Sequence, residues 1–317
     1  MTLKETFQRA QSGGFALGAF NVSTLEQIRA IVAAVDALKS PVILEVSPGE
    51  AEFLGIETLA AVRDSLVANH VNSPNPAKEK RQALRNFSEP ASGELAGSFP
   101  SGSIFLNLDH ARDLESIKRA LEAGFDMVHF DGSELSFAEN IERTREVVET
   151  AHREGALVEG EIDRAGGHSV LKSEIGDKVL TDPEKAAQFV SETGVDILAC
   201  FFGNLHGVYG EELALDLGHL AKIKKSVESV PKSVQSVFFS MHGGSGVKEE
   251  DVREAVKGGI VKVNVNTELR LAWSEALRDS LAKNPEEIVP YKVLIPVVEQ
   301  VQEVVENKIK LLGFSDK

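Results

Sequence analysis

Short apolar runs alternate with amphipathic stretches along the whole chain. Eight runs are almost continuously apolar, and they span residues 16–21, 41–46, 103–109, 126–131, 156–162, 195–202, 237–241 and 260–265. Strands covered on both faces have this character, and their alternation with helices is typical of β/α units around a parallel sheet. The pattern therefore predicts eight β/α units.

The stretches between the runs carry signals for helix ends. Ser23 and Glu26 form a predicted capping box, and Ser136 with Glu139 repeats that signal later in the chain. Glycines stand where three of these helices would end, at positions 124, 155 and 258. Eight strands alternating with eight helices favour an α/β fold of the (β/α)8 TIM-barrel type. The alternative is an open doubly wound sheet, which predicts a Gly-x-Gly-x-x-Gly turn that the chain lacks.

One segment, at about 70–102, interrupts the alternation. The stretch 69–102 holds four of the eleven prolines together with many serines and asparagines. We interpret it as a surface insertion between the second helix and the third strand, with a short helix at about 77–87. The whole chain, 1–317, is then expected to form a single domain, since barrels of this length are common.

Charge and cysteine content exclude several classes of function. The net charge is −15, and no cluster of Lys and Arg outlines a surface for nucleic acid or an anionic membrane. Binding of a phosphate group would therefore require local positive potential from backbone amides, helix N-termini, a metal ion or single cations. Cys200 is the sole cysteine, and the first ten residues lack the apolar core of a signal peptide, so a cytoplasmic location is expected.

Polar side chains collect at the predicted C-terminal ends of the strands, where the active site of a barrel lies. They are Asn21, Ser47, Asp109, His110, Asp131, Glu159, Glu161, Asn204, His206, His242, Asn264 and Asn266. So many ionisable and amide groups at converging strand ends predict a catalytic site.

Three histidines in this set, His110, His206 and His242, follow the third, sixth and seventh strands. Three neutral imidazoles with one open position form a catalytic zinc site, so we expect these rings to share a metal ion. Asp131 and Glu161 are candidates for an additional divalent-metal position. His129, inside the fourth strand, is interpreted as a structural residue.

A phosphate site is predicted beside the metal. His242 is followed by Gly-Gly-Ser-Gly, in which Gly243 and Ser245 are candidate ligand contacts, and Gly207 follows His206 in the same way. Strand eight ends in Asn264, Asn266 and Thr267 at the start of a helix. Barrels commonly bind phosphate between loops seven and eight, where backbone N–H groups and a helix dipole meet the oxygens.

With these residues placed, the chain resembles the class II, zinc-dependent ketose-bisphosphate aldolases, the family of fructose- and tagatose-bisphosphate aldolases. The resemblance covers nearly the whole chain except the insertion. It rests on Phe-Asn-Val at 20–22, Asn-Leu-Asp-His at 107–110, Asp-Gly-Ser at 131–133, Glu-Gly-Glu at 159–161 with Gly-Gly at 166–167, Gly-Asn-Leu-His-Gly-Val-Tyr at 203–209, His-Gly-Gly-Ser-Gly at 242–246 and Lys-Val-Asn-Val-Asn-Thr at 262–267.

This resemblance implies a lyase that reversibly cleaves a ketose 1,6-bisphosphate, most simply fructose 1,6-bisphosphate, into dihydroxyacetone phosphate and glyceraldehyde 3-phosphate. His110, His206 and His242 would hold the zinc ion, and Asp109 would protonate the aldehyde oxygen during condensation. Asp131 and Glu161 match alternative or second metal positions.

The resemblance also implies the substrate contacts and the assembly. The phosphate of the dihydroxyacetone half would be held partly through a monovalent cation, Na⁺ or K⁺, by Gly207, Gly243, Ser245, Asn264, Asn266 and Thr267. Asn21 and Ser47 would touch the substrate from strands one and two. Family members are often dimers or tetramers, so a homo-oligomer is expected, and the apolar stretch 293–312 is either an interface helix or packed on the barrel.

The loop after strand five departs from the family pattern. Gly166 and Gly167 usually precede an acidic stretch with the catalytic base, whereas here they precede His-Ser-Val-Leu-Lys-Ser-Glu. Glu174 or His168 is the candidate replacement, since a general base needs reach and a suitable pKa. Asp163 stands where the family commonly has glycine.

Other functions stay open at this level. A Schiff-base aldolase would use Lys262, and a barrel that has lost its base would bind sugar phosphates or a partner protein without catalysis. Tagatose bisphosphate or another ketose phosphate is an alternative substrate, because stereochemistry at the fourth carbon depends on fine side-chain placement.

Overall fold

The computed structural model describes residues 1–71, 104–163, 180–205, 207, 213–230 and 237–313. The insertion at about 70–102, with its expected helix, is therefore largely outside the described residues, as are His168, Glu174 and His206. The single-domain organisation stays a prediction.

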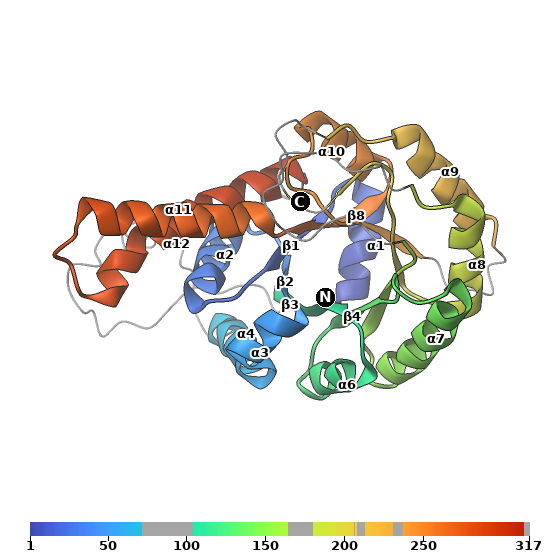
Figure 1. Ribbon diagram of the computed structural model, residues 1–317, viewed down its shortest axis with the longest axis horizontal. Helices are drawn as coiled ribbons and strands as arrows, with labels where there is room; N and C mark the ends of the chain where they lie inside the picture. Colours follow the sequence, from blue (N-terminus) through green and yellow to red (C-terminus); the bar gives the residue numbers. More distant parts are fainter. Residues whose placement is uncertain (72–103, 164–179, 206, 208–212, 231–236, 314–317) are drawn as a thin grey trace.

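Eight parallel strands close into a barrel in sequence order, as predicted (Figure 1). Its strands are β1 (Leu17–Asn21), β2 (Val42–Val46), β3 (Ile104–Ala111), β4 (Met127–Asp131), β5 (Leu157–Glu161), β6 (Ile197–Ala199), β7 (Phe238–Met241) and β8 (Ile260–Val265). All but one side chain in these strands is buried, which explains their continuous apolar runs in the sequence. The closure between β1 and β8 excludes the open doubly wound sheet.

Helices surround the barrel. They are α1 (Leu3–Gly13), α2 (Leu25–Leu38), α3 (Pro48–Leu54), α4 (Ile56–Val71), α6 (Leu114–Glu122), α7 (Phe137–Arg153), α8 (Pro183–Thr193), α9 (Leu217–Glu228), α10 (Glu249–Lys257), α11 (Thr267–Lys283) and α12 (Pro290–Leu311). The predicted alternation of eight strands with helices is confirmed; the second unit has two helices, α3 and α4, and α1 and α12 lie outside the repeat. None of the described helices combines the length and the apolar character needed to cross a membrane.

Inside the barrel, the side chains change from apolar to polar along most of the strands. Successive inward positions of β4 are Met127, His129 and Asp131, because side chains alternate between the two faces of a strand. Met127 belongs to an apolar cluster that includes Phe7 of α1, whose ring lies 5.5 Å from that of Phe238. The N-terminal half of the barrel is therefore a dry core closed by α1, and the polar side chains gather in the other half.

The apolar stretch at 293–312 lies mainly within α12, which packs on both α2 and α11. Its buried side chains Val297, Val301, Val305 and Ile309 recur at helical spacing and face these neighbours. In Figure 1 the α11–α12 pair projects away from the barrel. The simpler of the two expectations, packing within the chain, is confirmed for this stretch, and its role as an interface stays a prediction.

The predicted capping box of α2 is one residue out of register. Thr24, not Ser23, is the N-cap residue, and Gln27, not Glu26, closes the box. Ser23 instead donates its hydroxyl to Glu50. The second predicted box is confirmed at Ser136, where the side chain caps α7 together with Glu139.

Replacement of Thr24 by alanine should therefore lower the free energy of unfolding by about 1 kcal/mol, the usual cost of losing an N-cap hydroxyl. Urea unfolding measures it. Glu26→Gln serves as the control and should change stability by no more than a few tenths of a kcal/mol, because Glu26 does not close the box. Equal losses in the two variants would contradict this cap.

Candidate active site

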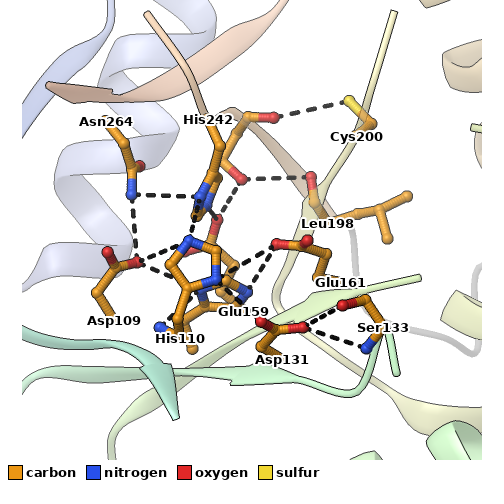
Figure 2. Close-up of polar contacts among 12 residues, drawn as sticks. Asp109, His110, Asp131, Ser133, Glu159, Glu161, Leu198, Cys200, His242 and Asn264 are labelled. Atoms are coloured by element: carbon orange, nitrogen blue, oxygen red, sulfur yellow. Dashed lines mark hydrogen bonds and ion pairs between the residues drawn. The ribbon is translucent and has the colours of Figure 1, made fainter. Parts of the chain in front are cut away.

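Two predicted histidines meet at the polar end of the barrel. Nδ1 of His242 lies 3.2 Å from Nε2 of His110. Their partners on the far sides fix both rings: Nε2 of His242 is 2.9 Å from Oε1 of Glu159, and Nδ1 of His110 is 3.2 Å from Oδ2 of Asp131. The remaining two nitrogens, Nε2 of His110 and Nδ1 of His242, face each other (Figure 2). In the neutral tautomers that donate to the two carboxylates, both of these nitrogens carry lone pairs.

This arrangement fits a shared metal ion. A proton on one ring joins these two nitrogens by a hydrogen bond, and a metal ion can replace that proton, since nitrogen ligands of a tetrahedral zinc ion are about 3.3 Å apart for Zn–N bonds of about 2.0–2.1 Å. Donor atoms of Asp109, His110, His129 and His242 all lie within 4.8 Å of one another. A second group of donors, His110, Asp131 and Glu161, has the same property.

His110 reaches the site through a backbone irregularity. Neighbouring residues of a strand normally point to opposite faces, yet Asp109 and His110 both face the cluster. Strand β3 shifts register against β4 between Leu108 and Ala111, and His110 has a φ of 52°. Such a β-bulge with a left-handed non-glycine residue costs conformational energy and is typical of functional sites.

The pKa values of His110 and His242 shift in opposite directions. Burial lowers the pKa of both, and His242 remains below its ordinary value. For His110 the nearby carboxylates, Asp109 first among them, outweigh burial and raise the pKa. A metal ion at His110 must therefore displace a proton, and its binding should weaken at low pH.

Asp109 lies beside His110 and below Asn264 in Figure 2 and has several hydrogen-bond partners. Its carboxylate accepts from Asn21 Nδ2 at 3.1 Å and from Asn264 Nδ2 at 3.3 Å, and one oxygen is 3.3 Å from His129 Nδ1. Burial raises the pKa of Asp109, but the positive potential of His110 and the neighbouring imidazoles overcomes it, so the pKa is held well below its usual range. This carboxyl group is therefore an ionised proton acceptor.

Asp131 and Glu161 flank the other side of His110. Ser133 donates to Asp131 through its backbone N–H at 3.1 Å and its hydroxyl at 2.6 Å. Burial raises the pKa of Asp131, but the bond with His110 and the nearby imidazoles lower it more strongly, so the net shift is downward. Glu161 has a buried Oε2 atom with no hydrogen-bond partner among the described residues, which fits a metal ligand or a position close to one.

Strands β1 and β2 bring the predicted substrate contacts together through Glu50. Its carboxylate accepts from Asn21 Nδ2 at 3.3 Å and from the Ser47 hydroxyl at 2.9 Å, and Ser47 also caps α3. Arg270 of α11 donates to the same carboxylate at 2.7 Å. Sequence reasoning missed Glu50 and Arg270, because both lie in the first turn of a helix, Glu50 in α3 and Arg270 in α11, and neither stands at a strand end.

The loops that follow β7 and β8 are neighbours, as the phosphate prediction requires. The backbone N–H of Gly244 donates to the carbonyl of Asn264 at 3.3 Å, and a Cβ at Gly244 would lie 2.7 Å from Val263 Cγ1. Positions close to this junction hold the predicted Gly243, Ser245, Asn266 and Thr267, of which Ser245 and Thr267 are buried. Asn266 Oδ1 is buried with no partner among the described residues, and Gly207 has a φ of 118° that favours glycine.

A charged network supports the site from below. Lys262 Nζ is 2.7 Å from Glu159 Oε2, 2.8 Å from Glu45 Oε1 and 2.7 Å from Asn264 Oδ1, and its side chain is fully buried. Glu159 in turn holds His242 and accepts the hydroxyl of Ser240. Burial lowers the pKa of Lys262, but Glu159 and Glu45 raise it by more than burial lowers it, so the amine is charged. A charged, enclosed amine is a poor nucleophile, which argues against a Schiff-base mechanism at Lys262.

The interpretation of His129 as a purely structural residue is incomplete. Its ring centroid lies 4.6 Å from that of His110 and 4.8 Å from that of His242, and its side chain is buried. The sequence contained a signal that His129 lies near the site, because His129 stands two residues before Asp131 and therefore on the same face of the same strand.

Glu45 gives this network a pH dependence. Burial raises the pKa of Glu45 from 4.5 to about 7; Lys262 counteracts this effect, and Asp109 and Glu159 add to it. Because its folded-state pKa is above the unfolded value, the folded protein should lose stability as the pH rises from about 4.5 to about 7. At about 1.4 kcal/mol per pH unit, this loss amounts to about 3 kcal/mol.

Replacement of Glu45 by glutamine should remove that dependence. The amide oxygen can still accept from Asn107 and Lys262, which now donate to Oε1 of Glu45 at 2.7 and 2.8 Å. Urea unfolding should show that the free energy of unfolding of the variant, relative to that of the unsubstituted protein, is higher at pH 8 than at pH 5. Parallel pH profiles of the two proteins would contradict an elevated pKa at Glu45.

Comparison with known proteins agrees with this geometry. The family model described as "Fructose-bisphosphate aldolase class-II" matches residues 1–317. The chain belongs to the class II fructose-bisphosphate aldolase family. It is accordingly an aldolase, a lyase with a TIM-barrel fold, and the resemblance seen in its motifs is confirmed.

Individual relatives differ in their reactions. The chain is 32% identical over 319 residues to a fructose-bisphosphate aldolase of Geobacillus stearothermophilus, covering 100% of this chain and 98% of the relative. It is 34% identical over 310 residues to a 6-phospho-5-dehydro-2-deoxy-D-gluconate aldolase of Shouchella clausii (strain KSM-K16), covering 97% and 92%. The crystal structure of the YdjI aldolase of Escherichia coli K12 is similar at a TM-score of 0.74 and 27% identity, covering 99% of this chain and 97% of that one.

Proposed function

We propose that this protein is a zinc-dependent aldolase that reversibly cleaves a ketose 1,6-bisphosphate, fructose 1,6-bisphosphate in the first instance, to dihydroxyacetone phosphate and glyceraldehyde 3-phosphate. The observation that carries the proposal is the pair of oriented imidazole nitrogens of His110 and His242, 3.2 Å apart and beside Asp109. His206 would be the third ligand.

The bound zinc ion would supply Lewis-acid stabilisation for the negative charge that develops next to the substrate carbonyl during cleavage. Asp109 would accept the proton of the hydroxyl group on the carbon that becomes the aldehyde, and would return it during condensation. Its ionised state suits this acceptor role, and the amides of Asn21 and Asn264 keep its two oxygens in place.

Several residues would bind the substrate and complete the proton transfers. Gly207, Gly243, Ser245, Asn264, Asn266 and Thr267 would hold the phosphate of the dihydroxyacetone half, with a monovalent cation as a further partner. The oxygen of Asn266, which has no hydrogen-bond partner in the described part of the chain, supports a cation or a hydroxyl group at this position. Asn21 and Ser47 would contact the sugar chain, and Glu174 or His168 would exchange the proton of the dihydroxyacetone half. Asp131 and Glu161 would form a second metal position with His110.

A second candidate substrate is the 6-phospho-5-dehydro-2-deoxy-D-gluconate named for the Shouchella clausii relative. Its similarity to this chain matches that of the fructose-bisphosphate aldolase, 34% against 32% identity. Cleavage of that compound likewise releases a phosphorylated ketone, so the zinc and phosphate contacts would be the same. The two substrates differ in the aldehyde half.

A retro-aldol assay on a panel of substrates tests the proposal. The panel contains fructose 1,6-bisphosphate, tagatose 1,6-bisphosphate and 6-phospho-5-dehydro-2-deoxy-D-gluconate, with enzymatic detection of dihydroxyacetone phosphate. We expect the highest kcat/KM for fructose 1,6-bisphosphate. A higher value for another member would transfer the substrate assignment to that compound.

Two further measurements address the remaining alternatives. Borohydride added with substrate should leave Lys262 unmodified and activity intact, because no Schiff base forms. Exchange of solvent tritium into dihydroxyacetone phosphate should be readily detected. Absence of both exchange and cleavage, with sugar phosphates still bound, would indicate a binding protein without catalysis.

A further inference from the structure

His129 occupies the inward position of β4 directly below the candidate metal ligands. Its side chain is completely buried, and its neighbours on the same face of the strand are Met127 and Asp131. The ring is inclined at 58° to that of His110 and at 64° to that of His242. A third imidazole therefore packs against the two that would bind zinc.

Both nitrogens of this ring are directed at carboxylates. Nδ1 lies 3.3 Å from Asp109 Oδ1, to which it donates when it carries a proton, and 3.2 Å from the backbone nitrogen of His110. On the opposite side of the ring, Nε2 lies 3.3 Å from Glu161 Oε2. Neither Nε2 nor that oxygen has a hydrogen-bond partner among the described residues. His129 thus spans the gap between the two carboxylates that flank the donor cluster.

The same geometry argues against His129 as an ordinary ligand. The nitrogens of His110 and His242 face each other at 3.2 Å, whereas those of His129 face an oxygen of Asp109 on one side and of Glu161 on the other. When both ring nitrogens carry protons for these carboxylates, the ring has no lone pair left for a shared ion. Its contacts serve to hold other groups.

We propose that His129 is a positioning residue that holds the carboxylates of Asp109 and Glu161 at fixed places on either side of the metal site. The inference rests on the proposed function, in which Asp109 moves a proton and Glu161 belongs to a metal position. Glu159 has the complementary role, since there a carboxylate orients the ring of His242.

The contribution of such a residue is geometric. A buried carboxylate that loses a partner moves toward whichever donor or cation remains, and here the strongest attraction is the metal itself. Without His129, Asp109 would retain Asn21 and Asn264, while Glu161 Oε2 would lose its contact at 3.3 Å and keep only the more distant Nδ1 of His110, at 3.8 Å, among the ion-pair contacts of the described residues. We therefore expect weaker and less specific metal binding together with slower proton transfer.

The variants His129→Met and His129→Gln test this role. Methionine fills a similar space without either nitrogen, and glutamine retains one polar end. Met127→Leu is the matched control, because Met127 is on the same face of the same strand, one layer deeper and in the apolar cluster. Thermal unfolding of the metal-free proteins shows whether each variant folds.

The principal readouts do not depend on turnover. In chelator competition, His129→Met should bind zinc about 10–100-fold more weakly, the usual effect of losing a residue that orients metal ligands. The visible absorption spectrum of the Co²⁺ form should keep the wild-type band positions, because the set of ligands is unchanged. His129→Gln should recover part of the affinity, and Met127→Leu should match the wild type in both measurements.

Kinetics complete the test. We expect kcat of His129→Met to fall at least tenfold with KM changed less than threefold, because the residue does not contact substrate. Wild-type metal affinity and kcat in His129→Met would overturn the proposal, as would a Co²⁺ spectrum that reports a lost ligand. If His129→Met fails to fold, His129→Gln is judged by the same criteria. Failure of the proposed function would appear differently, as an inactive wild type whose metal affinity still responds to His129.

Discussion

Removal of divalent metal ions with a chelator is expected to lower the rate of ketose bisphosphate cleavage by about a thousandfold or more, and added Zn²⁺ should restore it. A factor of a thousand corresponds to about 4 kcal/mol of transition-state stabilisation, within the range attributed to a Lewis-acid metal. The described part of the site offers little to replace the metal, since Lys262 is charged and enclosed between Glu45 and Glu159.

The variant His242→Ala should show the same loss without chelator. It removes one of the two facing nitrogens and leaves Glu159 with one partner fewer. His152→Gln is a suitable control, because His152 lies elsewhere and pairs with Asp196 at 2.8 Å. Metal content measured by mass spectrometry should fall in the first variant and stay constant in the second. Full activity in excess chelator, with metal content near zero, would refute metal dependence.

Replacement of Lys262 by methionine should destabilise the fold by about 3–5 kcal/mol at pH 8, the usual effect of removing one partner from a buried ion pair. Glu45 and Glu159 would both remain, fully buried, with no cation between them. At pH 5 the loss should be smaller, because Glu45, whose pKa is already raised to about 7, would be protonated.

Urea unfolding at both pH values measures this effect. Lys257→Met is the matched control, since Lys257 forms an ion pair with Glu254 in which both side chains are more than half exposed. Such surface pairs contribute at most about 1 kcal/mol. Addition of Glu159→Gln to Lys262→Met should recover part of the loss by removing one unpaired charge. A loss at Lys262 no larger than that at Lys257 would show that the buried network does not depend on the amine.

The order and number of the strands were predictable from the sequence because a parallel barrel buries both faces of every strand. That requirement leaves a continuous apolar run at each of the eight positions, with amphipathic helical stretches between them. Boundaries were less certain: β6 is limited to Ile197–Ala199, although the apolar run continues to Phe202. Burial alone produced that run, since Phe201 and Phe202 are buried outside the strand.

Among the candidate residues, the sequence alone identified His110, His242, Asp109, Asp131 and Glu161, because the C-terminal ends of barrel strands must converge whatever their loops do. It could not identify the second layer. Glu45 and Lys262 lie in the middle of strands, where a single polar residue in an apolar run has many explanations.

The contacts of these residues become clear only in the tertiary structure of the closed barrel. Closure places the inward positions of β2, β5 and β8 within ion-pair distance across its interior, so Lys262 meets both Glu45 and Glu159. The turn of His110 into the site likewise depends on a bulge between β3 and β4, which has no local signature in the sequence. Hydrophobic periodicity along the chain therefore determined which residues lie at the polar end, whereas partners in the interior follow from strand register, a property of the assembled sheet.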